Sequence, residues 1–137
     1  MRIQPYLQFD GRCEKGVRLY KAAVGAEVQM MTRHRESPTP PPPGRLPAGS
    51  EDKIMHVAFR IGDAVVMATD GMCGGKPAFN GSSLAVSVAT EADAKDALAR
   101  LAEGGSVQMP LTKRFWSAAF DMLLDCFGVS WRVMVAA

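Results

Sequence analysis

The apolar and polar positions along the chain form two kinds of pattern. Short runs in which large apolar and polar residues alternate predict eight β-strands. Two longer segments repeat apolar residues every three or four positions, which predicts amphipathic helices. The expected strands span residues 5–9, 27–35, 53–61, 64–69, 83–88, 106–112, 118–124 and 129–135.

Both expected helices carry recognisable start and stop signals. The first is expected from Gly11 to Val24, with Asp10 as its N-cap and Gly25 as the residue that ends it. Its buried stripe is expected to comprise Cys13, Val17, Tyr20 and Val24. The second begins at the capping-box sequence 90–93 (TEAD) and ends at the glycine pair 104–105. Its buried stripe is expected to comprise Ala94, Ala97, Leu98 and Leu101.

The order strand, helix, strand, strand, strand therefore occurs twice, in about residues 1–70 and 82–137. Two such modules can pair their sheets. We therefore expect an α+β fold in which residues 1–137 form one domain, with paired βαβββ modules making a curved mixed sheet around a concave cavity. Residues 37–50 hold six prolines, so they are expected to be a loop that extends a hairpin. A polyproline ligand for a recognition domain is the alternative. The glycine-rich residues 70–82 lack the spacing of a nucleotide-binding loop and are interpreted as a linker.

The composition narrows the class of protein. A net charge of +2, with no basic run interleaved with aromatic residues, argues against a nucleic-acid partner. No window approaches the roughly 18 apolar residues of a membrane span, and the N-terminus lacks the apolar stretch of a signal peptide. We therefore expect no membrane partner and a cytoplasmic location. Three cysteines without a CxxC motif suggest neither a disulfide framework nor a zinc knuckle.

Six ordered segments resemble the PhnB-like subgroup of the vicinal-oxygen-chelate (glyoxalase/bleomycin resistance/dioxygenase) superfamily. They are PYLQFDG at 5–11, LYKAAVGAE at 19–27, DKIMHVAFRIGDAVVMATD at 52–70, LAEGGSVQMPL at 101–111, FW at 115–116 and FGVSW at 127–131. The resemblance covers essentially the whole chain. It implies paired βαβββ modules, a homodimer, and a divalent metal held by His, Gln or Glu on four strands. Relatives are sometimes labelled as methyltransferases, but the chain has no glycine-rich turn typical of S-adenosylmethionine binding.

The metal site that the resemblance implies is not intact in this sequence. Ser83 stands where the family pattern has a His, and Arg132 stands where it has a Glu. In the first module the matching positions are near Gln4 and near Met67 or Ala68, of which only Gln4 could bind a hard cation. We therefore expect no metal and no other cofactor.

Arginine in place of a carboxylate suits an anion, because its planar donors match a carboxylate or phosphonate group. Alternation along the strands places Ser83 and Arg132 on the cavity side. His56 and Arg60 share one face of a strand and could surround an anionic group together with Arg132. His56 is also a candidate general base, although no carboxylate that would orient it is evident. The predicted ligand-binding residues are Tyr6, Gln8, His56, Arg60, Trp116 and Arg132.

Three functions fit these features. The first is a small-molecule-binding protein without the standard metal, whose ligand is an anion. The second is a metal-dependent lyase, isomerase or dioxygenase whose divalent metal binds at non-standard ligands, such as His56 with Gln4 or Gln8. The third is a regulatory or scaffolding dimer without a small ligand. The sequence assigns no catalytic residue.

Overall fold

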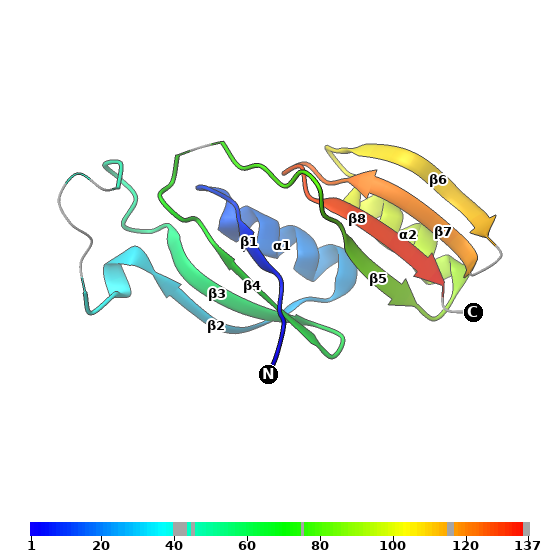
Figure 1. Cartoon of the computed structure of the whole chain (residues 1–137), viewed down its shortest axis with the longest axis horizontal. Helices are drawn as coiled ribbons and strands as arrows, with labels where there is room; N and C mark the ends of the chain where they lie inside the picture. The colour runs from blue at the N-terminus through cyan, green and yellow to red at the C-terminus, as the bar shows by residue number, and fades with distance from the viewer. Residues whose placement is uncertain (40–43, 45, 75, 115–116, 136–137) are drawn as a thin grey trace. The chain divides into compact units, whose positions relative to one another are not determined.

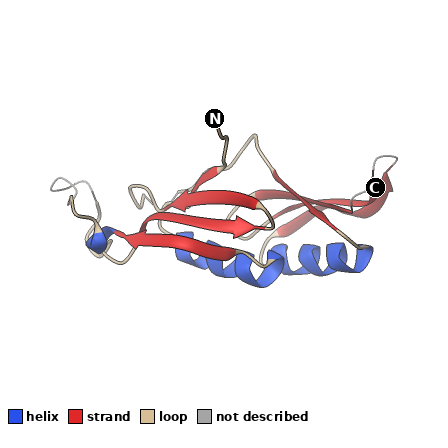
Figure 2. Ribbon diagram, turned by 90° about the horizontal axis from the view of Figure 1, so that it is seen from below, coloured by secondary structure: helices blue, strands red, loops and turns tan. Residues whose placement is uncertain are grey.

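The structure is a computed structural model that describes residues 1–39, 44, 46–74, 76–114 and 117–135. The chain separates into two compact units, Met1–Ala78 and Phe79–Ala137. Each unit contains one α-helix and one four-stranded sheet, and the helix lies across one face of the sheet (Figure 2). No helix among the described residues is both long enough and apolar enough to cross a bilayer.

The first unit has the predicted βαβββ order with a short 3-10 turn added. Its elements are β1 (Tyr6–Gln8), α1 (Cys13–Val24), β2 (Glu27–Arg33), η1 (His34–Glu36), β3 (Ile54–Ile61) and β4 (Ala64–Thr69). The sheet order is β1-β4-β3-β2, with β1 parallel to β4 and the other pairs antiparallel (Figure 1). The strand expected to run to residue 35 ends at Arg33, directly before η1. The proline-rich segment lies between β2 and β3, where the loop was expected, although residues 40–43 and 45 lie outside the described part of the chain.

The second unit repeats this arrangement. Its elements are β5 (Leu84–Val88), α2 (Glu91–Leu101), β6 (Ser106–Arg114), β7 (Ser117–Leu124) and β8 (Ser130–Val135). The order β5-β8-β7-β6 again makes the first strand the parallel neighbour of the last (Figure 1). Two helices with two four-stranded mixed sheets confirm the predicted α+β class.

The prediction that Asp10 caps the first helix is wrong. The helix begins at Cys13 and its N-cap is Arg12, which makes no side-chain capping bond. The carboxylate of Asp10 instead accepts hydrogen bonds from the backbone N–H groups of Gly74 (2.6 Å) and Lys76 (2.9 Å). The donors at the helix start bind Asp70, whose Oδ1 accepts from the backbone of residues 11 (2.9 Å) and 13 (2.7 Å).

The buried faces of the helices are close to those predicted. In α1, Ala23 is buried at the end of the stripe where Val24 was expected, and Gly25 adopts the left-handed conformation that ends the helix. In α2, the hydroxyl of Thr90 accepts from the backbone N–H of Asp93 (3.1 Å), which confirms the N-cap. The residues of α2 that are buried are Ala94, Ala97 and Leu101.

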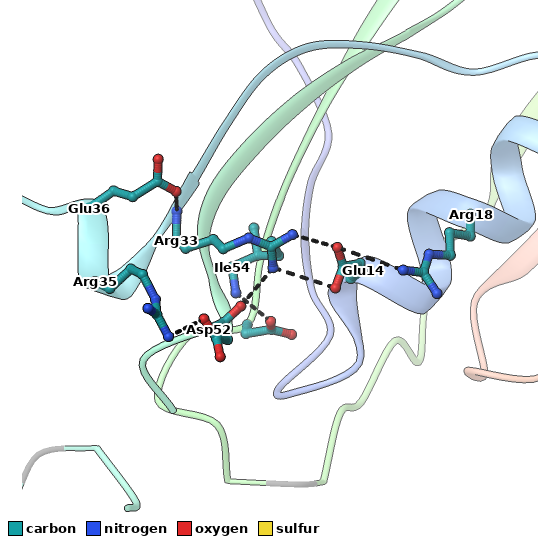
Figure 3. Close-up of polar contacts among 8 residues, drawn as sticks. Glu14, Arg18, Arg33, Arg35, Glu36, Asp52 and Ile54 are labelled. Atoms are coloured by element: carbon teal, nitrogen blue, oxygen red, sulfur yellow. Dashed lines mark hydrogen bonds and ion pairs between the residues drawn. The ribbon is translucent and has the colours of Figure 1, made fainter. Parts of the chain in front are cut away.

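A cluster of ion pairs joins α1 to the start of the proline-rich segment (Figure 3). Arg33, at the end of β2, donates to both carboxylate oxygens of Glu14, at 3.4 Å and 2.6 Å. The same guanidinium donates to the carbonyl oxygen of Asp52 (2.7 Å), and Asp52 also pairs with Arg35. The hydrogen bond with Arg33 is the main cause of the lowered pKa of Glu14. These contacts join the two ends of the loop between β2 and β3.

Candidate functional site

A cavity of about 590 Å³ lies within the second unit. This volume falls in the usual range of small-molecule pockets, roughly 300–1,000 Å³. The cavity is lined by Phe79, Asn80, Gly81, Ser82, Ser83, Gln108, Met122, Leu124, Gly128, Ser130 and Arg132.

The alternation of side chains along β8 explains which residues reach the cavity. Trp131, Val133 and Val135 are buried, while the residues between them are partly exposed. Helix α2 packs against β5, β7 and β8, so the buried residues form the face toward the helix. The opposite face therefore presents Ser130 and Arg132, as alternation predicted for Arg132.

Arg132 is the one charged residue among the described residues that line the cavity. Its guanidinium carbon lies 5.9 Å from the centre of the Phe120 ring, within the range of a cation–π contact. Within the described part of the chain, Arg132 forms no ion pair with a carboxylate. Its five donors are thus available to an anion.

Two hydroxyl groups lie at the start of the strands beside Arg132. Oγ of Ser83 is 2.7 Å from Oγ of Ser130, so one hydroxyl donates to the other. The parallel register pairs Leu84 with Trp131, so the residues that precede them, Ser83 and Ser130, also lie side by side. Sequence alternation had placed Ser83 on the cavity, and it lines the cavity here.

In the first unit, the structure brings together two of the predicted ligand-binding residues. The hydroxyl of Tyr6 and Nδ1 of His56 are hydrogen-bonded at 3.0 Å, and the ring centres are 5.6 Å apart. Gln8 is two residues along β1 and is exposed on the same face as Tyr6. The partner of the imidazole is therefore a phenol and not the carboxylate that would orient a general base.

Arg60 does not join this pair in the structure. Its guanidinium donates to Glu27 across the β2–β3 pairing, with an N–O distance of 2.7 Å. His56 and Arg60 lie four residues apart on β3, so their Cα atoms are about 13 Å apart in an extended strand. The remaining predicted residue, Trp116, lies outside the described residues.

Apart from Gln4, the residues at the positions where the family pattern implies metal ligands do not suit a divalent cation. Arg132 carries a positive charge that repels one, and Ser83 is hydrogen-bonded to Ser130. On β4, Met67 is the register partner of Tyr6, so its side chain lies on the same sheet face as that of Tyr6. Its thioether is a soft ligand and does not suit a hard divalent cation. Nowhere in the described ranges do three or more His, Cys, Asp or Glu side chains group as a metal site would require.

Sequence reasoning missed several residues of the cavity wall. Ser130 could have been found, because it lies two residues before Arg132 and so shares its face. Met122 is the strand neighbour of Arg132, but this follows only from the β7–β8 register. The position of Gln108 in the cavity wall could not be predicted by alternation along the strand, because β6 has a register shift between Val107 and Met109.

Comparisons with known proteins agree with this architecture. The family model described as "Glyoxalase/Bleomycin resistance protein/Dioxygenase superfamily" matches residues 2–133. Protein YjdN of Escherichia coli is 29% identical over 140 residues, covering 98% of this chain and 95% of that protein.

Two solved structures are similar over nearly their whole length. Protein PA1353 of Pseudomonas aeruginosa is 36% identical with a TM-score of 0.83, covering 99% of this chain and 98% of that one. A PhnB protein of Bacillus cereus, named as a putative 3-demethylubiquinone-9 3-methyltransferase, is 25% identical with a TM-score of 0.81, covering 99% and 100%. The chain therefore belongs to the glyoxalase/bleomycin resistance protein/dioxygenase superfamily, and its resemblance to PhnB-like proteins is confirmed.

Proposed function

We propose that the protein binds a small anionic molecule in the cavity of its second unit, with Arg132 as the anion-binding group and without the superfamily's standard metal. One observation carries the proposal: Arg132 is the one charged residue among the described cavity residues, and no carboxylate of the described residues pairs with it. A guanidinium that is partly withdrawn from water gains most from a ligand that supplies the missing negative charge.

The rest of the wall suits an organic acid. Met122 and Leu124 provide apolar contact, and the hydroxyls of Ser83 and Ser130 with the amide of Gln108 provide neutral hydrogen-bonding groups. Pockets for small molecules combine these features, with an apolar lining and a few polar groups that orient the ligand.

A metal-dependent lyase, isomerase or dioxygenase is not favoured. The side chains at the expected metal-ligand positions include the guanidinium of Arg132 and the thioether of Met67, neither of which suits a hard divalent cation. Elemental analysis of the purified protein tests this point. A metal bound in stoichiometric amount would contradict the metal-free proposal.

The methyltransferase activity in the name of the Bacillus cereus protein is not carried over to this chain. Residues 9–12, which connect β1 to α1, hold one glycine and do not form the glycine-rich turn of a nucleotide-type cofactor site. The homodimer remains a prediction from the family resemblance, and sedimentation of the purified protein would test it.

The proposal is tested by thermal denaturation of the full chain with a panel of acids: methylphosphonate, phenylphosphonate, succinate and benzoate. A ligand that binds the folded state raises the midpoint as its concentration exceeds the Kd. We expect at least one acid to stabilise the wild type and to lose its effect in Arg132→Ala. Arg18→Ala is the matched control, because the Arg18 side chain is 75% exposed on α1. No stabilisation by any acid, or equal stabilisation of Arg132→Ala, would overturn the proposal.

A further inference from the structure

The serine pair beside Arg132 has a defined hydrogen-bonding capacity. Two hydroxyl groups carry two hydrogens, and the 2.7 Å contact between Ser83 and Ser130 uses one of them. The other hydrogen remains free to donate. The pair can therefore offer one hydrogen bond to an acceptor atom of a ligand.

The free hydroxyl and the guanidinium lie on one wall of the cavity. Ser130 and Arg132 are two residues apart on β8 and face the same side, so their Cα atoms are about 7 Å apart. The contact with the Phe120 ring holds the guanidinium at that wall. A short ligand can thus contact both groups at once.

The charge of the wall limits what the second ligand group can be. The described lining holds a single cation, so a second anionic group would find no positively charged partner there, whereas a neutral acceptor needs none. A neutral acceptor, such as an amide or ketone oxygen, matches the single available hydroxyl hydrogen.

We propose that the ligand is a monoanionic acid with a neutral carbonyl acceptor a few bonds from the acid group. The acid group binds Arg132, and the carbonyl oxygen accepts from the Ser83–Ser130 pair. This inference rests on the proposed function, because it assigns the chemical class of the ligand to the same cavity.

The test compares three acids with similar carbon chains: succinamate, which has an acid and an amide, succinate, which has two acids, and butyrate, which has one acid. Each is titrated into the ¹⁵N-labelled full chain near neutral pH while backbone amide shifts are followed by NMR. In the wild type we expect succinamate to bind roughly fivefold more tightly than butyrate, the factor contributed by one net hydrogen bond. Succinate is also expected to bind less tightly than succinamate.

Variants separate this inference from the proposed function. The double variant Ser83→Ala with Ser130→Ala should bind butyrate as the wild type does and lose the preference for succinamate. Arg132→Gln should weaken all three acids. Ser87→Ala is the matched control and should retain the preference, because Ser87 is an exposed serine of β5 that is absent from the described cavity lining. The amide spectrum of each variant reports whether it is folded.

Three results would overturn the inference. They are equal affinities of the wild type for succinamate and butyrate, an unchanged preference in the double serine variant, and binding of none of the three acids. If Arg132→Gln binds all three acids as the wild type does, the proposed function fails as well. The control Ser87→Ala shows whether a lost preference in the double variant is specific to the Ser83–Ser130 pair.

Discussion

The backbone N–H of Val133 donates a 3.1 Å hydrogen bond to Oδ1 of Asp121, while Oδ2 of the same carboxyl is buried without a partner among the described residues. Asp121 is 0% exposed. It alternates along β7 with the cavity residue Met122, so it lies on the sheet face toward α2, whose buried side chains are apolar. Burial raises the pKa of Asp121 from 3.8 to about 6, and the hydrogen bond from Val133 opposes this only in part.

The raised pKa predicts that the protein loses stability as the pH rises through about 6. The folded state holds the proton of Asp121 more tightly than the unfolded chain, so its contribution is fully present below pH 3.8 and lost above about 6. The expected loss is about 2 to 3 kcal/mol in the free energy of unfolding. Asp121→Asn should remove this part of the pH dependence, as measured by urea unfolding across the window.

The control for this prediction is Asp63→Asn, at an exposed position in the turn between β3 and β4. It should change the stability at all pH values by a similar, small amount. If the free energy of unfolding of Asp121→Asn depends on pH in the same way as that of the wild type, the buried carboxyl does not titrate in this window.

Two aspartates of the first unit, Asp70 and Asp10, accept hydrogen bonds from backbone N–H groups. Asp70 is predicted to contribute more to the stability of the fold. It is 1% exposed and accepts from Gly11, Cys13 and Ile54, the last at 2.8 Å. Hydrogen bonds to a buried charge are strong, and unpaired donors are costly. Asp70→Asn should therefore lower the free energy of unfolding by about 2–4 kcal/mol. The partly exposed Asp10, changed to Asn, should cost less; an equal or larger loss there would contradict this ranking.

Gly16 is predicted to resist replacement by alanine, although alanine favours helices by about 1 kcal/mol. A Cβ at this position would lie 2.8 Å from Cε1 of Phe9, and Phe9 is 0% exposed against Tyr20. Because the fully buried ring would have to move to admit the methyl group, Gly16→Ala should lower stability by about 1–3 kcal/mol. Urea unfolding measures this, with the exposed neighbour Lys15→Ala as the control. A more stable Gly16→Ala protein would show that the ring shifts easily.

The fold could be predicted from the sequence because its main signals are local. Alternation at residues 83–88 and 129–135 was enough to assign the faces of β5 and β8, including the position of Arg132 in the cavity wall. The helix ends at Gly25 and Thr90 depend on neighbouring residues and were predicted correctly.

The errors and omissions involve contacts between distant parts of the chain. The carboxylate that accepts from the backbone at the start of α1 belongs to Asp70, which is 57 residues from Cys13, so no local pattern could distinguish it from Asp10. The pairing of Arg60 with Glu27 follows from the β2–β3 register. The contact between Tyr6 and His56 joins β1 and β3, which are separated in the sheet by β4. Asp121 did leave a signal, a charged residue in the apolar stripe of β7, but its missing partner appears only in three dimensions.

The most direct test of the anion-binding cavity is isothermal titration of the acid with the largest thermal shift in the panel. The wild type, Arg132→Gln and the exposed control Arg18→Gln are compared under identical conditions. A charge-assisted hydrogen bond to an anion contributes about 1.5–3 kcal/mol, so Arg132→Gln should weaken binding by at least about tenfold. Arg18→Gln should leave the Kd unchanged. If Arg132→Gln binds as tightly as the wild type, Arg132 is not the anion-binding group and the proposed function is wrong.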